Sequence, residues 1–285
     1  MVLIHSPRCL EYHAPGHPER PQRLTGIVAR LKPQTHHQWL TPEPCREEDI
    51  LRVHTREHLR RVQTGDYSDA DTPHFPGIYE IARLAAGAAI LAAEEAVAGR
   101  PAFSLMRPPG HHAERERVMG FCYFNNLAIA VAKMLEERAR KRVAIVDFDC
   151  HHGNGTEDIF CGVERVRFIS LHQSPCYPGT GTANRKNCLN FPLRPGTGPV
   201  EFLKALASAV EAVRDFEPEL VAVSAGFDSY KGDPITEMGL ETTTYRQVGA
   251  RLGGMGRPCF AVLEGGYAKE LGECVAEFVA GWEQS

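Results

Sequence analysis

Two carboxylates and an imidazole follow a short apolar run near the middle of the chain. Asp147, Asp149 and His151 alternate just after residues 143–146, and alternate residues of a strand share one face. Burying such groups without a compensating cation is costly. Aspartate and histidine side chains together are suitable ligands for a divalent metal. The spacing therefore predicts a metal site where a buried strand emerges from its sheet.

Other apolar runs also end in groups that can do chemistry: His111 and His112, Asp228, and Tyr267. Ligands of open parallel sheets bind beyond the carboxyl ends of the strands, so we expect these groups to gather at one edge. Asp149, His151 and Asp228 would form a three-ligand metal site with an open position. That arrangement is typical of a hydrolytic metal centre.

A repeated alternation of strands and helices would position these groups. Almost wholly apolar runs predict strands that are buried on both faces, at residues 102–106, 142–149, 165–171, 220–226 and 259–263. Helical patterns cover residues 21–31, 79–98, 127–140, 199–216 and 242–252. This alternation predicts an α/β fold with a central parallel β-sheet flanked by helices and the active site at the C-terminal ends of the strands.

The organisation predicts one domain over residues 1–285. Residues 173–198 are rich in proline and glycine and predict a long functional loop inside that domain. Apart from the helix at 21–31, the first seventy residues predict loops and short helices packed round the site.

Composition narrows the classes of function. The 285 residues are 43% hydrophobic and 24% charged with a net charge of -4, and this mild acidity argues against direct nucleic-acid binding, which needs a basic face. No apolar run reaches membrane-spanning length and the N-terminus lacks the features of a secretory signal, so we expect no membrane partner and a cytoplasmic location. The nine cysteines are scattered without a C-x-x-C pair, which favours free thiols.

Several long motifs occur in one order along the chain: HPERPQRL (17–24), RPPGHH (107–112), GFCYFNN (120–126), DFDCHHGNGT (147–156), YPGTG (177–181), AGFD (225–228) and EGGY (264–267). Together they resemble the metal-dependent histone deacetylase and acetylpolyamine amidohydrolase superfamily, closer to its class II and bacterial branch than to class I. The resemblance covers nearly the whole chain. It implies an arginase-type fold and a hydrolase that removes acetyl or other acyl groups from the ε-amino group of lysine in proteins or peptides.

The resemblance implies two kinds of bound cation. Asp149, His151 and Asp228 match the zinc ligands, and ferrous iron would suit the same set. The second cation is structural, usually potassium, and the residues matching its backbone site are Asp147, Asp149, His151, Ser170 and Leu171.

The catalytic roles also follow from the resemblance. His112 matches the general base that later acts as general acid, His111 its electrostatic partner and Asp147 the carboxylate that orients His111. Tyr267 matches the tyrosine that polarises the substrate carbonyl and stabilises the oxyanion. Asn154 stands where class I members carry an aspartate beside the second histidine, although class II relatives share the asparagine. An amide can orient an imidazole without stabilising its cation by charge, so we predict that His112 is less basic than its class I counterpart.

Further matches outline a channel: the aromatic walls Phe121 and Tyr177, the lining residues Gly120 and Gly265, the rim residue Asp71 and, near the acetate exit, Arg23. Ile235 lies seven residues after Asp228, about where a polyamine-selective member would place an acidic gatekeeper. Its apolar side chain favours an acyl-lysine substrate, although Glu237 is close by.

Three alternatives stay open at this point. One is the same chemistry on acetylpolyamines or other small N-acyl amines. Another is a catalytically inactive scaffold that binds acyl-lysine, against which Tyr267 and both histidines speak. A third is a binuclear manganese hydrolase of the arginase kind, which would need additional aspartate ligands round both metals.

Overall fold

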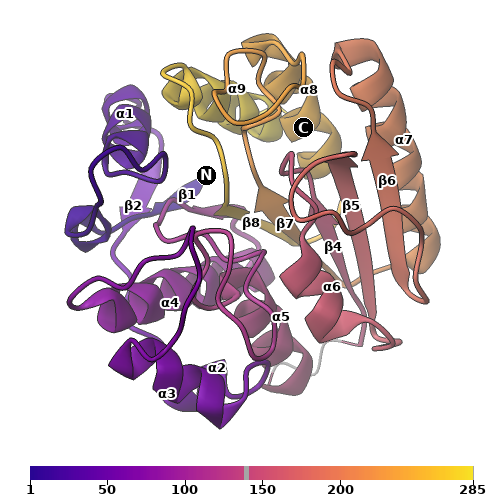
Figure 1. The fold of residues 1–285 in the computed structure, drawn as a ribbon. Helices are drawn as coiled ribbons and strands as arrows, with labels where there is room; N and C mark the ends of the chain where they lie inside the picture. Colours follow the sequence, from indigo (N-terminus) through magenta and orange to yellow (C-terminus); the bar gives the residue numbers. More distant parts are fainter. Residues whose placement is uncertain (138–140, 285) are drawn as a thin grey trace.

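The computed structural model describes residues 1–137 and 141–284, and one central sheet runs through it (Figure 1). The sheet has eight strands in the order β2-β1-β3-β8-β7-β4-β5-β6, and every pairing between them is parallel. The strands are β1 (Val2–Ile4), β2 (Gln38–Leu40), β3 (Ala102–Ser104), β4 (Val143–Asp147), β5 (Val166–Gln173), β6 (Cys188–Leu193), β7 (Leu220–Ala225) and β8 (Cys259–Leu263). The predicted α/β fold with a central parallel sheet is confirmed.

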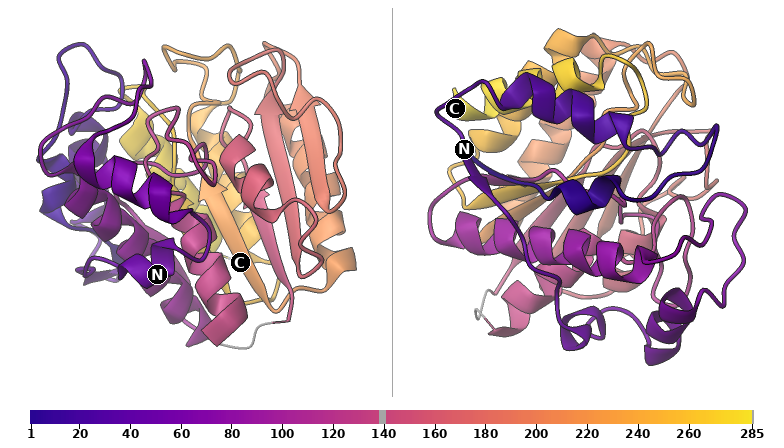
Figure 2. Two further views of the ribbon diagram at one scale, coloured as in Figure 1. Left: turned by 60° about the horizontal axis from the view of Figure 1, so that its bottom comes forward. Right: turned by 90° about the vertical axis from the view of Figure 1, so that its left-hand side faces the viewer.

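Helices cover both faces of the sheet, with α1, α7, α8 and α9 on one face and α4 and α5 on the other (Figures 1 and 2). The helices are η1 (Pro7–Leu10), α1 (Gln22–Leu31), α2 (Glu47–Ile50), α3 (Arg56–Thr64), α4 (Ile78–Val97), α5 (Asn126–Glu137), α6 (Asn154–Phe160), α7 (Pro199–Phe216), α8 (Thr242–Gly253) and α9 (Leu271–Glu283). Within the described ranges, no helix combines the length and apolarity needed to cross a membrane. All nine cysteines are free thiols.

The core lies between the sheet and these helices. Every residue of β4, β7 and β8 is buried, as strands covered on both faces require. Small side chains let α4 approach the sheet closely, and its Ala82, Ala86, Ala89 and Ala93 are fully buried. The rigid layers fix where the strands end, and therefore where the loops carrying polar groups begin.

The structure corrects several predicted boundaries. Residues 173–198 are not one long loop, because β5 continues to Gln173 and β6 occupies Cys188–Leu193. β6 is an edge strand, and only such a strand readily tolerates a proline like Pro192. Because proline is typical of loops, the sequence did not indicate a strand here. The first seventy residues are not free of strands, since β1 and β2 each contribute three residues. The end of the helix predicted over residues 127–140 falls outside the described residues.

Candidate active site

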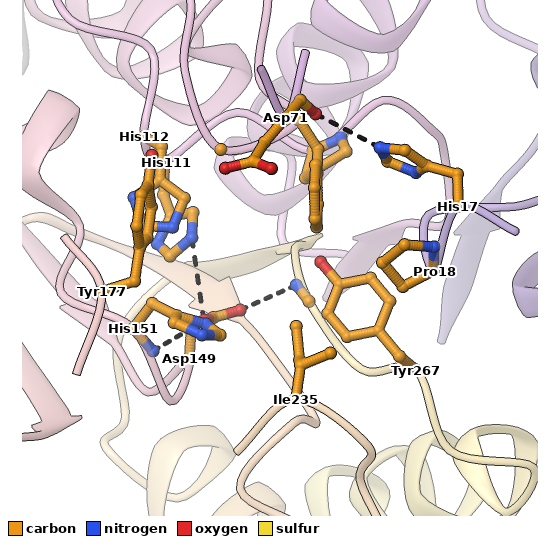
Figure 3. Close-up of a pocket in the computed structure, with 14 residues that line it drawn as sticks. His17, Pro18, Asp71, His111, His112, Asp149, His151, Tyr177, Ile235 and Tyr267 are labelled. Carbon is orange, nitrogen blue, oxygen red and sulfur yellow. Dashed lines mark hydrogen bonds and ion pairs between the residues drawn. The ribbon is translucent and has the colours of Figure 1, made fainter. Parts of the chain in front are cut away.

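A pocket of about 340 Å³ opens at the carboxyl edge of the sheet (Figure 3). Residues predicted for the site make up most of its lining: Asp71, His111, His112, Gly120, Phe121, Asp149, His151, Tyr177, Ile235, Gly265 and Tyr267. Asp147, Asn154 and Asp228 are buried behind that lining. Side chains from loops far apart in the sequence thus meet at the edge where the sequence places them.

Three of these side chains form a compact group of possible metal ligands. β4 ends at Asp147, so Asp149 and His151 lie in the following loop and do not continue the strand face that the sequence predicts. Nδ1 of His151 is 3.1 Å from Oδ1 of Asp149 and 3.0 Å from Oδ2 of Asp228. Asp228 follows β7, the neighbour of β4 in the sheet.

The donor set fits a divalent metal. Ligand atoms of Asp149, His151 and Asp228 all lie within 4.8 Å of one another, and all three residues are buried. The separations measured from Nδ1 of His151 approach the roughly 3.3 Å between neighbouring ligands of a tetrahedral zinc ion. Burial and the adjacent carboxylate of Asp149 raise the pKa of Asp228. A bound cation would remove that repulsion, so these residues are suited to hold one.

The position beside this group requires a glycine at residue 265. The amide of Gly265 donates a hydrogen bond to Oδ2 of Asp149, 2.7 Å away. A Cβ atom at Gly265 would lie only 2.6 Å from the same oxygen, well inside van der Waals contact. Glycine therefore lets the loop after β8 approach the carboxylate closely.

The histidine pair lies in the loop that follows β3. Nδ1 of His111 is 3.1 Å from Oδ2 of Asp147, and Nδ1 of His112 is 2.7 Å from Oδ1 of Asn154. Burial alone would lower the pKa of His111, but the carboxylates of Asp149 and Asp147 raise it to about 10. Burial and the neighbouring His111 lower the pKa of His112 well below its usual value. Without a metal ion, these surroundings favour the charged form of His111 and the neutral form of His112, which can accept a proton.

A carboxylate without a predicted role fixes the loop that carries this pair. Oε2 of Glu264 accepts hydrogen bonds from the backbone amides of Gly110 at 2.7 Å and His111 at 3.1 Å. Burial raises the pKa of Glu264 to about 7. Glu264 belongs to the EGGY motif, yet its partner 154 positions earlier is visible only in the fold.

Tyr267 reaches the pocket from the side opposite the histidines, with its hydroxyl pointing inward (Figure 3). Its backbone amide donates to Oδ2 of Asp233, 2.7 Å away, and burial raises the pKa of Asp233 to about 7. The guanidinium of Arg23 lies 4.7 Å from the centre of the Tyr267 ring. Arg23 also borders a separate cavity of about 220 Å³ that shares Tyr267 with the main pocket, so this arginine stands behind the site and not in it.

Aromatic side chains form the walls of the pocket. Phe121 has a φ of 70°, a strained conformation for a residue with a side chain, and its amide donates to the hydroxyl of Thr72 at 3.0 Å. The Tyr177 ring stands edge-on to His112 at 5.1 Å. The His17 ring centre lies 4.7 Å from that of Phe121, and its Nε2 lies 3.3 Å from the carbonyl oxygen of Asp71.

The residues predicted for the structural cation lie at the end of β4, in the loop that follows it and within β5. Asp147 of β4 is paired with Ser170 of β5 in the sheet register. Ser170 and Leu171 are fully buried, and the loop with Asp149 and His151 begins beside them.

A second histidine group lies away from the pocket. His36, His37 and Glu283 bring possible ligand atoms within 4.8 Å of one another. The Glu283 carboxylate already accepts a hydrogen bond from the amino group of Met1, 2.7 Å away. We assign this group no role.

The parallel sheet, the buried Asp149–His151–Asp228 group and the histidine pair define a metal-dependent amidohydrolase. Residues 17–282 match the histone deacetylase domain, and the chain belongs to that family. It is 38% identical to a probable deacetylase of Methanothermobacter thermautotrophicus over 99% of this chain and 90% of the relative. It is 33% identical to acetylpolyamine amidohydrolase 1 of Pseudomonas aeruginosa, over 93% of this chain and 91% of that protein.

A solved structure agrees with this assignment. The crystal structure of the HDA15 HD domain superposes with a TM-score of 0.93 at 32% identity, covering 100% of this chain and 91% of that one. The chain is therefore a hydrolytic deacetylase of the histone deacetylase family.

Proposed function

We propose that this deacetylase removes acetyl or other acyl groups from the ε-amino group of lysine in proteins or peptides. The observation that supports this proposal is the apolar residue at the mouth of the pocket. Ile235 lines the pocket, is 39% exposed and projects into it (Figure 3). Glu237 is absent from the described residues that line the pocket, so the carboxylates there are those of Asp71 at the rim and Asp149 in the metal-ligand group. The apolar walls suit the alkyl stem of a lysine side chain.

The proposed catalytic ion is zinc, held by Asp149, His151 and Asp228, with ferrous iron as the other metal that suits this set. When bound, it would lower the pKa of a water molecule and polarise the amide carbonyl. The proposal also includes a structural potassium ion at the backbone of Asp147, Asp149, His151, Ser170 and Leu171.

The side chains then have separate tasks in amide hydrolysis. Nε2 of His112 accepts a proton from the attacking water and returns it to the leaving amine. The Tyr267 hydroxyl donates a hydrogen bond to the carbonyl oxygen as that oxygen gains negative charge. His111 stays cationic beside Asp147 and favours the same negative charge. Arg23 lies on the side where acetate would leave, in the cavity behind Tyr267.

A comparison of substrates tests this proposal. Wild type should show a kcat/KM for an acetyl-lysine peptide at least about tenfold above that for acetylspermidine, the difference expected from one charged contact. Ile235→Glu should narrow or reverse that ratio by adding an acid at the mouth. Val163→Glu is the matched control, because Val163 is 37% exposed and lies outside the pocket.

The competing substrate class is supported by the similarity to several acetylpolyamine amidohydrolases. A wild-type preference for acetylspermidine would overturn lysine as the substrate while leaving the amide chemistry in place. Equal effects of Ile235→Glu and Val163→Glu would remove Ile235 from substrate selection.

A further inference from the structure

A carboxylate outside the pocket contacts the residue that orients His112. Oε1 of Glu114 accepts a hydrogen bond from Nδ2 of Asn154 at 2.8 Å. The Glu114 side chain is 28% exposed and does not line the pocket. A tight turn holds it, since its backbone amide donates to the carbonyl oxygen of Arg117 at 3.0 Å and the Arg117 guanidinium donates to Oε1 at 3.2 Å.

This contact determines which way the Asn154 amide faces. A carboxylate accepts hydrogen bonds but does not donate them, so the nitrogen of the amide must face Glu114. The amide oxygen then faces Nδ1 of His112, 2.7 Å away. An oxygen acceptor at that distance requires a proton on Nδ1. Nε2 of His112 is left with the lone pair that a general base needs.

The opposite orientation would disable the base. With the amide nitrogen facing Nδ1, that atom would have to act as acceptor and the imidazole proton would move to Nε2. The other groups near Nδ2 of Asn154 are weak acceptors or distant ones: the Met119 sulfur at 3.2 Å and the His112 carbonyl oxygen at 3.5 Å. Glu114 is the charged acceptor among them.

We infer that Glu114 is a positioning residue, which holds the Asn154 amide in one orientation and thereby fixes the tautomer of His112. The inference rests on the proposed role of His112 as the base. Helix α6 supports the geometry, because the amides of Gly155 and Thr156 in its first turn donate to the carbonyl oxygen of His111 at 3.1 and 3.2 Å. The histidine loop and Asn154 are therefore held side by side.

Single substitutions give the first test. Glu114→Ala should lower kcat on an acetyl-lysine peptide about tenfold, the effect of losing a hydrogen bond to a charged group. KM and bound zinc should stay within about twofold, because Glu114 touches neither the pocket nor the metal ligands. Glu114→Gln keeps an oxygen acceptor and should recover most of kcat. Glu116→Ala is the control, an exposed acid two residues along the same loop.

A double-mutant cycle separates orientation from a merely structural effect. In Asn154→Asp both side-chain oxygens accept, so no orientation has to be selected, and one of them meets the Glu114 carboxylate. Adding Glu114→Ala relieves that repulsion and should cost less than about twofold in kcat at the pH plateau, or raise kcat. An equal loss from Glu114→Ala in both backgrounds would overturn the inference, as would full activity of Glu114→Ala in the wild-type background. An inactive wild type would refute the proposed function instead.

Discussion

Nδ1 of His112 lies 2.7 Å from an amide oxygen of Asn154, not from a carboxylate. The pair orients the imidazole without placing a negative charge beside it. Burial and the neighbouring His111 lower the pKa of His112, so this histidine is neutral, and able to accept a proton, at pH values below its usual titration range. That His112 is less basic than its class I counterpart stays a prediction, because the lowering comes from burial and His111 and not from Asn154.

Replacing Asn154 by aspartate should therefore change the pH dependence of the reaction. A carboxylate in contact with an imidazole raises its pKa by about 1–3 units. The limb at which kcat/KM falls on acidification should move to higher pH by at least about 1 unit in Asn154→Asp. The measurement is a pH–rate profile of both proteins with one acetyl-lysine peptide. Identical acidic limbs would contradict the assignment of His112 as the base.

Asp233 should matter through Tyr267. Its two carboxylate oxygens accept hydrogen bonds from the backbone amides of Tyr267 at 2.7 Å and Ile235 at 3.1 Å. Asp233→Ala removes both acceptors, so we expect kcat to fall about tenfold and the free energy of unfolding to fall by about 1–3 kcal/mol. Asp233→Asn retains one oxygen acceptor, so its kcat and its free energy of unfolding should lie between those of wild type and Asp233→Ala. Kinetics and denaturant unfolding measure the two effects, and lost stability with unchanged kcat would limit Asp233 to a structural role.

Removal of the metal should cost both activity and stability. The chelated protein keeps two buried carboxylates, Asp149 and Asp228, side by side without a cation, and ligand linkage at saturating zinc predicts a fall in Tm of roughly 5–10 °C. Zinc should restore both properties. Asp228→Asn should bind zinc much more weakly by elemental analysis, whereas Asp215→Asn, on the exposed surface of α7, should bind it normally. Unchanged zinc binding in Asp228→Asn would refute this ligand set.

Glu157 should make the fold sensitive to acid. Burial alone would raise its pKa, but contacts with His152, Asn190 and Arg185 lower it to about 2. The folded state therefore holds a proton on Glu157 less readily than the unfolded chain does. The contribution of ionised Glu157 to the free energy of unfolding is complete above the usual glutamate pKa of about 4.3. It is lost as pH falls toward about 2.

Glu157→Gln removes this dependence, so the free energy of unfolding should fall less steeply between about pH 4.5 and 2.5 than in wild type. Denaturant titrations over that range give the slope. The control is Glu217→Gln, whose side chain is 68% exposed and pairs with Arg142 at the surface. Equal slopes for wild type and Glu157→Gln would show that the buried contacts do not bias its titration.

The sequence predicted the residues that do the chemistry better than the residues that hold them in place. Asp149, His151 and Asp228 follow apolar strands within a few residues, and parallel strands must bring their carboxyl ends together. The strands themselves were predictable where they were long and buried, as at β4 and β7. The edge strand β6 was not predicted because its Pro192 is typical of a loop. β1 and β2 were not predicted because a strand of three residues is too short to show a recognisable pattern.

The supporting residues depend on contacts between distant parts of the chain. Glu264 holds the histidine loop, Asp233 holds Tyr267 and Glu114 holds Asn154. Each is an acid in an ordinary loop setting whose partner lies 34 to 154 positions away. No local pattern specifies such a partner, so these roles require the fold.

Acetate release from an acetyl-lysine peptide by wild type and Tyr267→Phe, both loaded with zinc, tests the central claim most directly. Loss of one donor to the developing oxyanion predicts a fall in kcat of about 10²–10³-fold, with zinc content unchanged because Tyr267 is not a ligand. A Tyr267→Phe protein that keeps the wild-type rate, or a wild type that releases no acetate from any acyl-lysine peptide, would contradict the account.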